Sequence, residues 1–314
     1  MTLNKLTPIL IIGFNRPLTL SSLLSKVESL ESREILISLD GPRTDNDGLN
    51  VRSTREVADS WAYTTHHHVK VVKRSENLGI YNHFTQALTD LFDEFDVGII
   101  LEDDIDFRNE FVSYVDEHQV YLNSNKYWSI CGHNPGLPSN HDHSSLPVTM
   151  RETYVHTIWG WATGKDSFQK YLDFLKVPSE ETIATSLAAI SRKITRDPFL
   201  RLGIVATWRR KMLRALKSSK QSGWDNFWLV AGWNSGLVSL LPCCSISTEV
   251  NYFDEGQTHP HQVDSSPLLG LPTEIVFSES STRYKVGSDV ALLNVWGITR
   301  LYCWIFVLRL IGRK

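Results

Sequence analysis

Short apolar runs alternate with segments of helical spacing along the first third of the chain. Four apolar runs predict buried strands, at residues 8–14, 34–39, 69–73 and 97–101. The segments between them have apolar positions spaced as on one face of a helix, at residues 18–30, 51–62 and 80–95. Alternation of strands and helices is typical of βαβ units. We therefore predict an α/β fold with a mainly parallel central sheet flanked by helices.

The pattern loosens after residue 111. Residues 127–131 predict a further strand, and the composition of residues 135–147 predicts a loop. Residues 178–220 are helical and become increasingly basic, through Arg209, Arg210, Lys211, Arg214, Lys217 and Lys220. Two interpretations of this basic segment stay open: a solvated helix face, or a contact with anionic lipid or a phosphorylated acceptor.

Composition narrows the class of protein. With 314 residues the chain is long enough for one large domain or for a core domain plus a smaller lobe, and its 42% hydrophobic content suits a buried core. A net charge of −3 provides no basic field, so we expect no nucleic-acid partner. The four cysteines form neither a C-x-x-C pair nor a disulfide framework, which favours a reducing compartment.

Neither end of the chain predicts a membrane span. The apolar run at residues 10–12 is interrupted too early for a secretory signal. No segment reaches the roughly 20 apolar residues that cross a bilayer. Residues 291–311 come closest, and they form either a helix lying in a membrane interface or a helix docked on the core. We therefore expect a cytoplasmic protein, which the first alternative would place on the anionic inner face of the cytoplasmic membrane.

Polar residues follow three of the predicted strands. Arg16 comes after the first, Asp40 after the second, and Glu102, Asp103 and Asp104 come directly after the fourth. In an open α/β sheet, ligands bind in the crevice outside the carboxyl ends of the strands. We therefore expect these side chains to converge on one ligand site.

The run of three carboxylates predicts a metal site. Adjacent carboxylates repel one another unless a cation neutralises them. Oxygen ligands without a nearby cysteine suit a hard divalent cation, Mg²⁺ or Mn²⁺, which takes its remaining ligands from substrate phosphates and water. An isolated Asp-Asp pair is more often a solvated turn, but the position after the apolar run at residues 97–101 favours the metal.

A metal-bound nucleotide diphosphate needs partners for its other groups. Asp40 can accept a hydrogen bond from a pyrimidine N–H, and Arg16 can pair with phosphate or base oxygens. Each residue is, taken alone, also explained as a turn residue.

Two further polar residues stand out in the second half. Asp225 lies among tryptophans in G-W-D-N-F-W, where a carboxylate can have a raised pKa; the alternative is a helix N-cap. His259, in G-Q-T-H-P, is either a metal or phosphate ligand or an ordinary loop histidine. We assign no role to the remaining histidines, which lie in polar segments such as residues 66–68. The chain contains no Ser/His/Asp or Cys/His arrangement and no P-loop.

Several of these segments occur in an order that resembles a known family. PILIIGFNRP, ISLDGPR and ENLGIYNHFTQALTDLFDEFDVGIILEDDIDF are followed by HTIWGWATGKDSFQKY, SGWDNFWLVAGWNSGLVSLLP and VNYFDEGQTHP. Together they resemble GT-A fold glycosyltransferases of the N-acetylglucosaminyltransferase I group and their bacterial, family 2-like sugar-transferase relatives. The resemblance spans roughly residues 8–262. It implies a GT-A domain over residues 1–265, followed by a C-terminal helical extension over residues 266–314.

The resemblance implies that residues 1–110 form the nucleotide-binding half. Arg16 and Asp40 would contact the nucleotide, and Glu102 would reach its ribose or base. Asp104 would coordinate the metal directly, with Asp103 near the sugar.

Residues 111–265 would then form the acceptor half. Asp225 would act as the general base, and Trp159, Gly160 and Trp161 would shape the sugar pocket. His259 would lie near the metal and the diphosphate.

The chain departs from the family pattern at two positions. Asn226 stands where the animal enzymes carry a second Asp, so the general base rests on Asp225 alone. Tyr252 replaces a Gly before His259, which puts the local geometry there in doubt.

These observations predict a metal-dependent, inverting glycosyltransferase. It would move a sugar from a nucleotide-diphosphate donor to a hydroxyl of a glycan or glycolipid acceptor, as in the synthesis of cell-surface polysaccharide. The alternatives are a nucleotidyltransferase, which would need a Gly-rich phosphate loop after the first strand, and a non-catalytic nucleotide-sugar-binding protein.

Overall fold

A computed structural model describes residues 6–124, 126–134, 150–176, 179–194, 198–217, 224–242 and 245–249. The strands of its main sheet are β1 (Ile9–Gly13), β2 (Glu34–Leu39), β3 (His68–Lys73), β4 (Val97–Glu102), β6 (Tyr127–Cys131), β7 (Met150–Thr153), β8 (Trp161–Gly164) and β9 (Val238–Pro242). They lie in the order β3-β2-β1-β4-β8-β6-β9-β7. A second, two-stranded sheet pairs β5 (Ile105–Phe107) with β10 (Ser247–Glu249).

The main sheet is mostly parallel. β1 pairs in parallel with β2 and with β4, and β2 pairs in parallel with β3. β8 lies antiparallel between β4 and β6, and β7 lies antiparallel at the edge beside β9. Since β6 and β9 are parallel to each other, every strand of this sheet except β7 and β8 ends at the same edge. This carboxyl edge is where the ligand site of an α/β sheet is expected.

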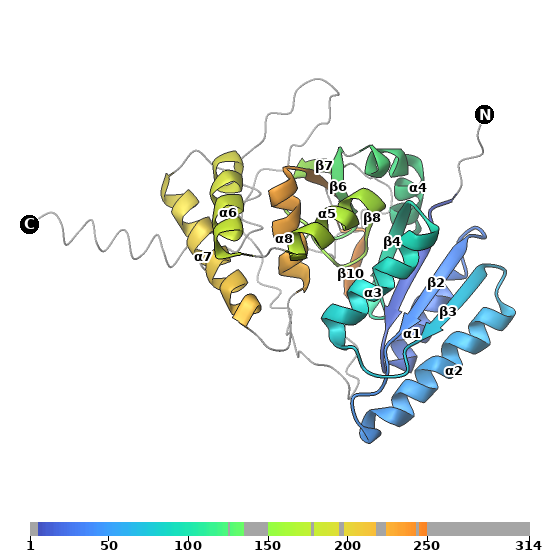
Figure 1. Ribbon diagram of the computed structural model, residues 1–314. Helices are drawn as coiled ribbons and strands as arrows, with labels where there is room; N and C mark the ends of the chain where they lie inside the picture. The colour runs from blue at the N-terminus through green and yellow to red at the C-terminus, as the bar shows by residue number, and fades with distance from the viewer. Residues whose placement is uncertain are drawn as a thin grey trace, which may run out of the picture.

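Helices cover both faces of the sheet (Figure 1). They are α1 (Pro17–Val27), α2 (Gly48–Thr64), α3 (Gly79–Glu94), α4 (Asn109–Asn123), α5 (Lys165–Lys176), α6 (Glu180–Ile194), α7 (Pro198–Lys217) and α8 (Trp224–Ser235). The alternation of side chains along each strand divides the core in two. Leu10, Leu36 and Ile100 pack with α3, α5 and α8, whereas Ile9, Ile11 and neighbouring alternate positions pack with α1, α2 and α4.

The prediction of an α/β fold with a mainly parallel sheet flanked by helices is confirmed. The strands at residues 34–39 and 127–131 have the predicted bounds. The helix α4 was not predicted, although its buried side chains, Phe111, Val112, Val115 and Leu122, lie at helical spacing. The helical segment predicted at residues 178–220 consists of two separate helices, α6 and α7. The second begins at Pro198, a residue disfavoured inside a helix and favoured at its start.

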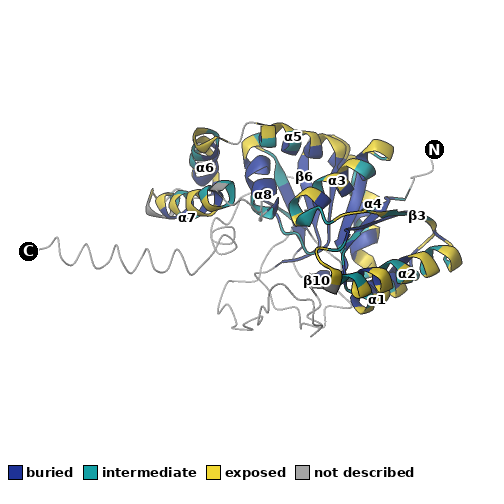
Figure 2. Ribbon diagram, turned by 60° about the horizontal axis from the view of Figure 1, so that its bottom comes forward, coloured by how far each residue is buried: buried dark blue, intermediate teal, exposed yellow. Residues whose placement is uncertain are grey.

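α6 and α7 form a helical hairpin that lies beyond the end of the sheet and packs on α8 (Figures 1 and 2). Its inner side chains, which include Ile183, Leu187, Ile204 and Trp208, join the same core as α3, α5 and α8. Within the described part of the chain, no helix combines the length and the apolar character needed to cross a membrane. The predicted extension over residues 266–314, with its helix at 291–311, lies outside the described residues.

Candidate functional site

The carboxyl ends of β1, β2 and β4 meet at the centre of the carboxyl edge. Gly13, the last residue of β1, is in register with Leu39 of β2, and Ile12 is in register with Glu102 of β4. The turn after β1 therefore lies between the residues that follow β2 and β4. This register places Arg16 beside Asp103 and Asp104, as expected from the sequence.

Arg16 and the acidic turn, which we define as Glu102–Asp104, form one charged cluster. The Arg16 guanidinium forms ion pairs with both Asp103, at 3.3 Å from Oδ1, and Asp104. The second oxygen of Asp103 accepts a hydrogen bond of 3.4 Å from the backbone N–H of Phe14. Burial raises the pKa of Asp103 to about 7, against the opposing effect of Arg16. The Arg16 guanidinium thus neutralises part of the negative charge of the acidic turn. The sequence predicts that a metal ion neutralises this charge.

The acidic turn also borders open space. Asp103 and Asp104 line a cavity of about 350 Å³ together with residues of α1, among them Thr19, Ser22 and Lys26. Lys26 in turn forms an ion pair with Asp106. The oxygen atoms of Asp103 and Asp104, with no thiol or imidazole in this lining, are chemically suited to a hard divalent cation.

Asp40 is buried and organises the loop before α3. Its carboxylate accepts hydrogen bonds from the backbone N–H of Gly41 and Leu78, both at 2.9 Å, and from the backbone N–H of Gly79 at 3.2 Å. The side-chain amide of Asn77 adds a fourth at 3.0 Å. A carboxylate has about four acceptor positions, so these donors from the chain itself fill them. Asp40 thus holds the loop before α3, and none of the described contacts joins it to Arg16 or to the acidic turn.

The turn formed by Trp159 and Gly160 reaches the same edge from β8. Because β8 is antiparallel to β4, it starts where β4 ends. Gly160 has a φ of +71°, and a Cβ there would lie 2.8 Å from Ser247 and 3.4 Å from Cγ2 of Ile105. Ile105 directly follows the acidic turn, so the two turns are neighbours. Trp161, expected to shape a sugar pocket, instead packs in the core with 1% of its surface exposed.

Trp159 also borders a second cavity, of about 260 Å³. We call it the Asp225 cavity; its lining consists of His133, His156, Thr157, Ile158, Trp159, Trp208, Asp225, Asn226 and Leu229. Asp225 is the second residue of α8, not the residue before the helix, and burial raises the pKa of its carboxyl group. Oδ1 of Asp225 accepts a hydrogen bond of 3.0 Å from the side chain of Asn226.

Among the lining residues of the Asp225 cavity that were not predicted from the sequence are His133, His156 and Trp208. His133 follows β6, so the rule applied to the ends of β1, β2 and β4 would have found it. His156 lies between β7 and β8, and its Nδ1 is 2.6 Å from Oγ of Ser129. Trp208 comes from α7 and carries no signal in the sequence beyond its aromatic character.

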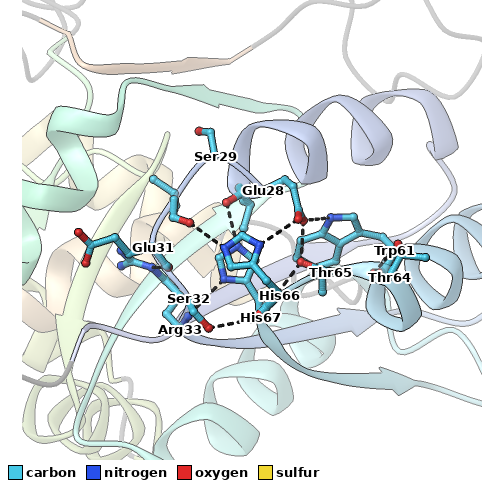
Figure 3. A network of polar contacts seen from close by, with 12 residues as sticks. Glu28, Ser29, Glu31, Ser32, Arg33, Trp61, Thr64, Thr65, His66 and His67 are labelled. Carbon is cyan, nitrogen blue, oxygen red and sulfur yellow. Dashed lines mark hydrogen bonds and ion pairs between the residues drawn. The ribbon is translucent and has the colours of Figure 1, made fainter.

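Residues 66–68, expected to be polar loop residues without a role, include a buried histidine. His67 accepts a hydrogen bond at Nδ1 from the backbone N–H of Arg33 and contacts the carbonyl of Val27 through Nε2, at 3.2 and 3.0 Å. His66 lies between the carboxylate of Glu28 and the carbonyl of Leu30, at 3.0 and 3.1 Å (Figure 3).

Glu28, His66 and His67 are the one set of three potential metal ligands that comes together within the described ranges. Trp61 and Thr65 also donate to the Glu28 carboxylate, at 2.8 and 2.6 Å. Every ligand atom of the set is thus engaged in a hydrogen bond. We conclude that this cluster braces the ends of α1 and α2 against the start of β3.

His259, predicted to lie near the metal, is outside the described residues. No protein-family model matches the chain, and no curated protein matches it. The features that bear on function are therefore those of the carboxyl edge.

Proposed function

We propose that the chain is a metal-dependent glycosyltransferase of the GT-A fold, which transfers a sugar from a nucleotide diphosphate to a hydroxyl group with inversion. One observation carries this proposal. The Trp159–Gly160 turn is next to both the acidic turn and the Asp225 cavity, because Gly160 lies close to Ile105 and Trp159 lines the cavity. A group suited to a metal-bound diphosphate and a buried carboxylate that share an aromatic turn are what such a transfer requires.

The acidic turn supports the donor side of the proposal. Asp104 would hold a Mg²⁺ or Mn²⁺ ion, with Asp103 close to the sugar and Glu102 towards the ribose. A bound divalent cation offsets the negative charge that develops on the leaving diphosphate. Arg16, now paired with Asp103 and Asp104, would turn part of its guanidinium to the phosphate oxygens. Asp40 would act indirectly, by fixing the loop beside them.

Asp225 supports the acceptor side. As the general base it would take the proton of the acceptor hydroxyl that attacks the sugar from the face opposite the diphosphate, which gives inversion. A carboxylate with a raised pKa is a better base than one in water, and burial raises the pKa of Asp225. General-base assistance of this kind contributes roughly 10²–10⁴ in rate.

The hairpin supports an acceptor held at a membrane. Arg210, Lys211 and Arg214 are exposed on α7. A cluster of such side chains is attracted to anionic lipid by about 1 kcal/mol per basic residue near the surface. A glycolipid acceptor on the inner face of the cytoplasmic membrane, as in cell-surface polysaccharide synthesis, would lie beside the Asp225 cavity, which α7 borders through Trp208.

Ligand-induced stabilisation tests the proposal. Unfolding would be followed with a panel of nucleotide sugars in the presence of Mn²⁺. A ligand at 100 times its Kd adds about 2.7 kcal/mol to the free energy of unfolding, which we expect for at least one donor. The Asp104→Asn variant should lose the Mn²⁺-dependent part of this gain, because the diphosphate loses the ligand that joins it to the metal.

Asp225→Asn separates an enzyme from a binding protein. We expect this variant to keep the donor-induced stabilisation and to lose 10²-fold or more in turnover of the donor. Near-normal turnover would remove Asp225 as the base. Failure of every nucleotide sugar to stabilise the wild type would overturn the proposal as a whole.

A further inference from the structure

Basic side chains gather on α7 without acidic ones. The helix contains Arg201, Arg209, Arg210, Lys211, Arg214 and Lys217 and neither Asp nor Glu, although the whole chain has a net charge of −3. Arg209 is paired with Glu180 of α6. Arg210, Lys211 and Arg214 are exposed and form no ion pair with another described residue. We call these three residues the α7 basic group.

Helical spacing places the members of the α7 basic group next to one another. Residues three and four apart are neighbours on a helix surface, so Arg214 adjoins both Lys211 and Arg210. Like charges at this spacing repel each other and destabilise the helix. A bound anion relieves this repulsion, because it pairs with more than one of the cations. The group therefore has the charge of an anion-binding surface, and none of the described residues supplies its counterion.

One member of the group is held beside the Asp225 cavity. The Lys211 ammonium lies over the indole ring of Trp208, 4.4 Å from its centroid, which is the geometry of a cation–π contact. Trp208 lines the Asp225 cavity. Burial raises the pKa of Asp225, and the charge of Lys211 opposes this effect. Lys211 is thus close enough to interact both with the wall of the cavity and with its carboxylate.

The α7 basic group belongs to the acceptor side of the proposed function. Burial has the largest effect on the pKa of Asp103, and the charges that act on it most are those of Arg16 and Asp104. Lys211 instead acts on Asp225. α7 also packs on α8, the helix that contains Asp225. An anion on the group would therefore accompany the hydroxyl at Asp225, and not the diphosphate at the acidic turn.

Phosphate is the anion that suits this arrangement. A phosphate monoester carries a charge of about −1.5 to −2 at pH 7, which matches several cations within one turn of a helix. An arginine guanidinium pairs with two phosphate oxygens at once, and a lysine adds a point charge. The carboxylate of Asp225 repels an anion inside the cavity. The phosphate would therefore stay outside, over α7, while the part of the acceptor that carries the hydroxyl enters.

We infer that the α7 basic group binds a phosphate group of the acceptor, and that Lys211 holds this phosphate while the acceptor hydroxyl reaches Asp225. This inference rests on the proposed function and deepens it, because it names a phosphate-bearing acceptor and a residue that selects it. The phosphate belongs either to a water-soluble sugar phosphate or to a lipid-linked sugar, since both offer the same group to α7.

Binding to the intact protein tests the inference in two arms. The soluble arm compares the 1-phosphates of glucose, galactose and N-acetylglucosamine with the methyl glycosides of the same sugars. The lipid arm compares these sugars joined to an alkyl chain through a diphosphate with the corresponding alkyl glycosides, all in vesicles of phosphatidylcholine, which has no net charge. EDTA is present in both arms, so that no metal ion holds a phosphate at the acidic turn.

We expect the phosphate-bearing probe to bind about tenfold or more tightly than its neutral counterpart in at least one arm, which corresponds to about 1.4 kcal/mol. The arm that responds identifies the source of the phosphate. The preference should decrease as NaCl is added, because salt screens exposed charges. Absence of a preference in both arms would overturn the inference.

Lys211→Gln should weaken the phosphate-bearing probe about fivefold or more and leave the neutral probe unchanged, whereas Lys211→Arg should keep the preference. The matched control is Lys193→Gln. Lys193 is an exposed lysine of α6 that also lies over an aromatic ring, 5.4 Å from the centroid of Tyr154, but neither residue lines the Asp225 cavity. An equal loss in the control variant would show that any exposed charge on the hairpin suffices, and it would overturn the inference.

Failure of the inference is distinct from failure of the proposed function. Stabilisation by a nucleotide sugar with Mn²⁺, without any preference for a phosphate-bearing probe, would remove the inference and leave the proposed function standing. A preference that depends on Lys211, in a protein that no nucleotide sugar stabilises, would do the reverse and leave a phosphate site on α7. Loss of the donor-induced stabilisation in Lys211→Gln would place the group at the donor diphosphate, and the inference would be wrong.

Discussion

The two sides of the carboxyl edge satisfy their polar groups in opposite ways. On the side of the acidic turn, Arg16 pairs with Asp103 and Asp104, and four donors from the chain occupy Asp40. On the side of the Asp225 cavity, buried nitrogen atoms of His133, His156 and Trp208 have no partner among the described residues. On the first side the carboxylates are thus paired within the chain, although Nε of Arg55, whose guanidinium donates to the carbonyl of Asp40, is also buried without a partner among the described residues.

The ion pairs of Arg16 bear on binding at the acidic turn. Under the proposed function, a metal ion and a diphosphate would compete with Arg16 for Asp104, so part of their binding free energy would be spent on rearranging an existing ion pair. The Asp225 cavity has no ion pair among its described lining residues that a ligand would have to break in this way.

The largest effect on stability is expected from Asp40→Ala, on the side of the acidic turn, where the carboxylates are paired within the chain. The change leaves the backbone N–H groups of Leu78 and Gly79, and the other donors to Asp40, without their acceptor. We expect the free energy of unfolding to fall by about 3 kcal/mol. Urea denaturation measures it. The control Asp45→Ala removes an exposed carboxylate nearby and should stay within about 0.5 kcal/mol of wild type. Equal stabilities of the two variants would show that Asp40 does not hold the loop.

Gly160→Ala tests the Trp159–Gly160 turn, which is next to both the acidic turn and the Asp225 cavity. At a φ of +71°, with Ser247 2.8 Å from the new Cβ, we expect a loss of about 1–3 kcal/mol in the free energy of unfolding, with Trp159 displaced. The control Gly48→Ala has a φ of −58° and no atom within 4 Å of the new Cβ. It should stabilise the protein by about 0.4–1 kcal/mol. A neutral effect of Gly160→Ala would contradict the tight contact between the turns.

The smallest effect is the pH dependence of stability that comes from His156, a neutral histidine of the Asp225 cavity. His156 has a folded-state pKa of about 3, so between that value and its unfolded pKa near 6.5 the unfolded state binds more protons. Its contribution is full above pH 6.5 and is lost as the pH falls. Relative to His156→Gln, the wild type should lose about 1 kcal/mol of stability between pH 7 and pH 5.5.

His66 supplies a control of opposite sign for this pH dependence. Its hydrogen bond to Glu28 raises its pKa, so its contribution is present at low pH and is lost as the pH rises through the folded value. The difference between the wild type and His66→Gln should therefore grow as the pH falls, whereas the difference for His156→Gln shrinks. The same sign for both variants would contradict the neutral state of His156.

The sequence predicted the first half of the fold well because its signal is local. The strands at β1, β2 and β4 are continuous apolar runs, and the polar residues after each run lie at one edge once the strands are parallel. The convergence of Arg16 and the acidic turn was predicted in this way, whereas the ion pairs between them were not.

The rest of the site depends on contacts between distant segments. The Asp225 cavity is lined by His133, His156, Trp208 and Asp225, which come from four separate parts of the chain. The spacing of residues within any one segment therefore does not predict that they lie together. The hydrogen bonds of Asp40 and the burial of Trp161 were also not predictable from the sequence, because both depend on segments distant along the chain. Asp40 follows a strand, and the position of residues 77–79 decides whether its carboxylate binds the chain itself or a ligand. Trp161 follows a turn, and packing alone decides that its side chain lies in the core.

The hairpin of α6 and α7 gives the molecule a modular character. It lies outside the sheet, yet through Trp208 it forms part of the wall of the Asp225 cavity. Its outer positions can therefore vary, whereas its inner side chains, such as Ile183, Leu187 and Ile204, are constrained by the core that they share with the sheet. Under the proposed function, acceptor preference could evolve on this hairpin while the donor chemistry stays fixed.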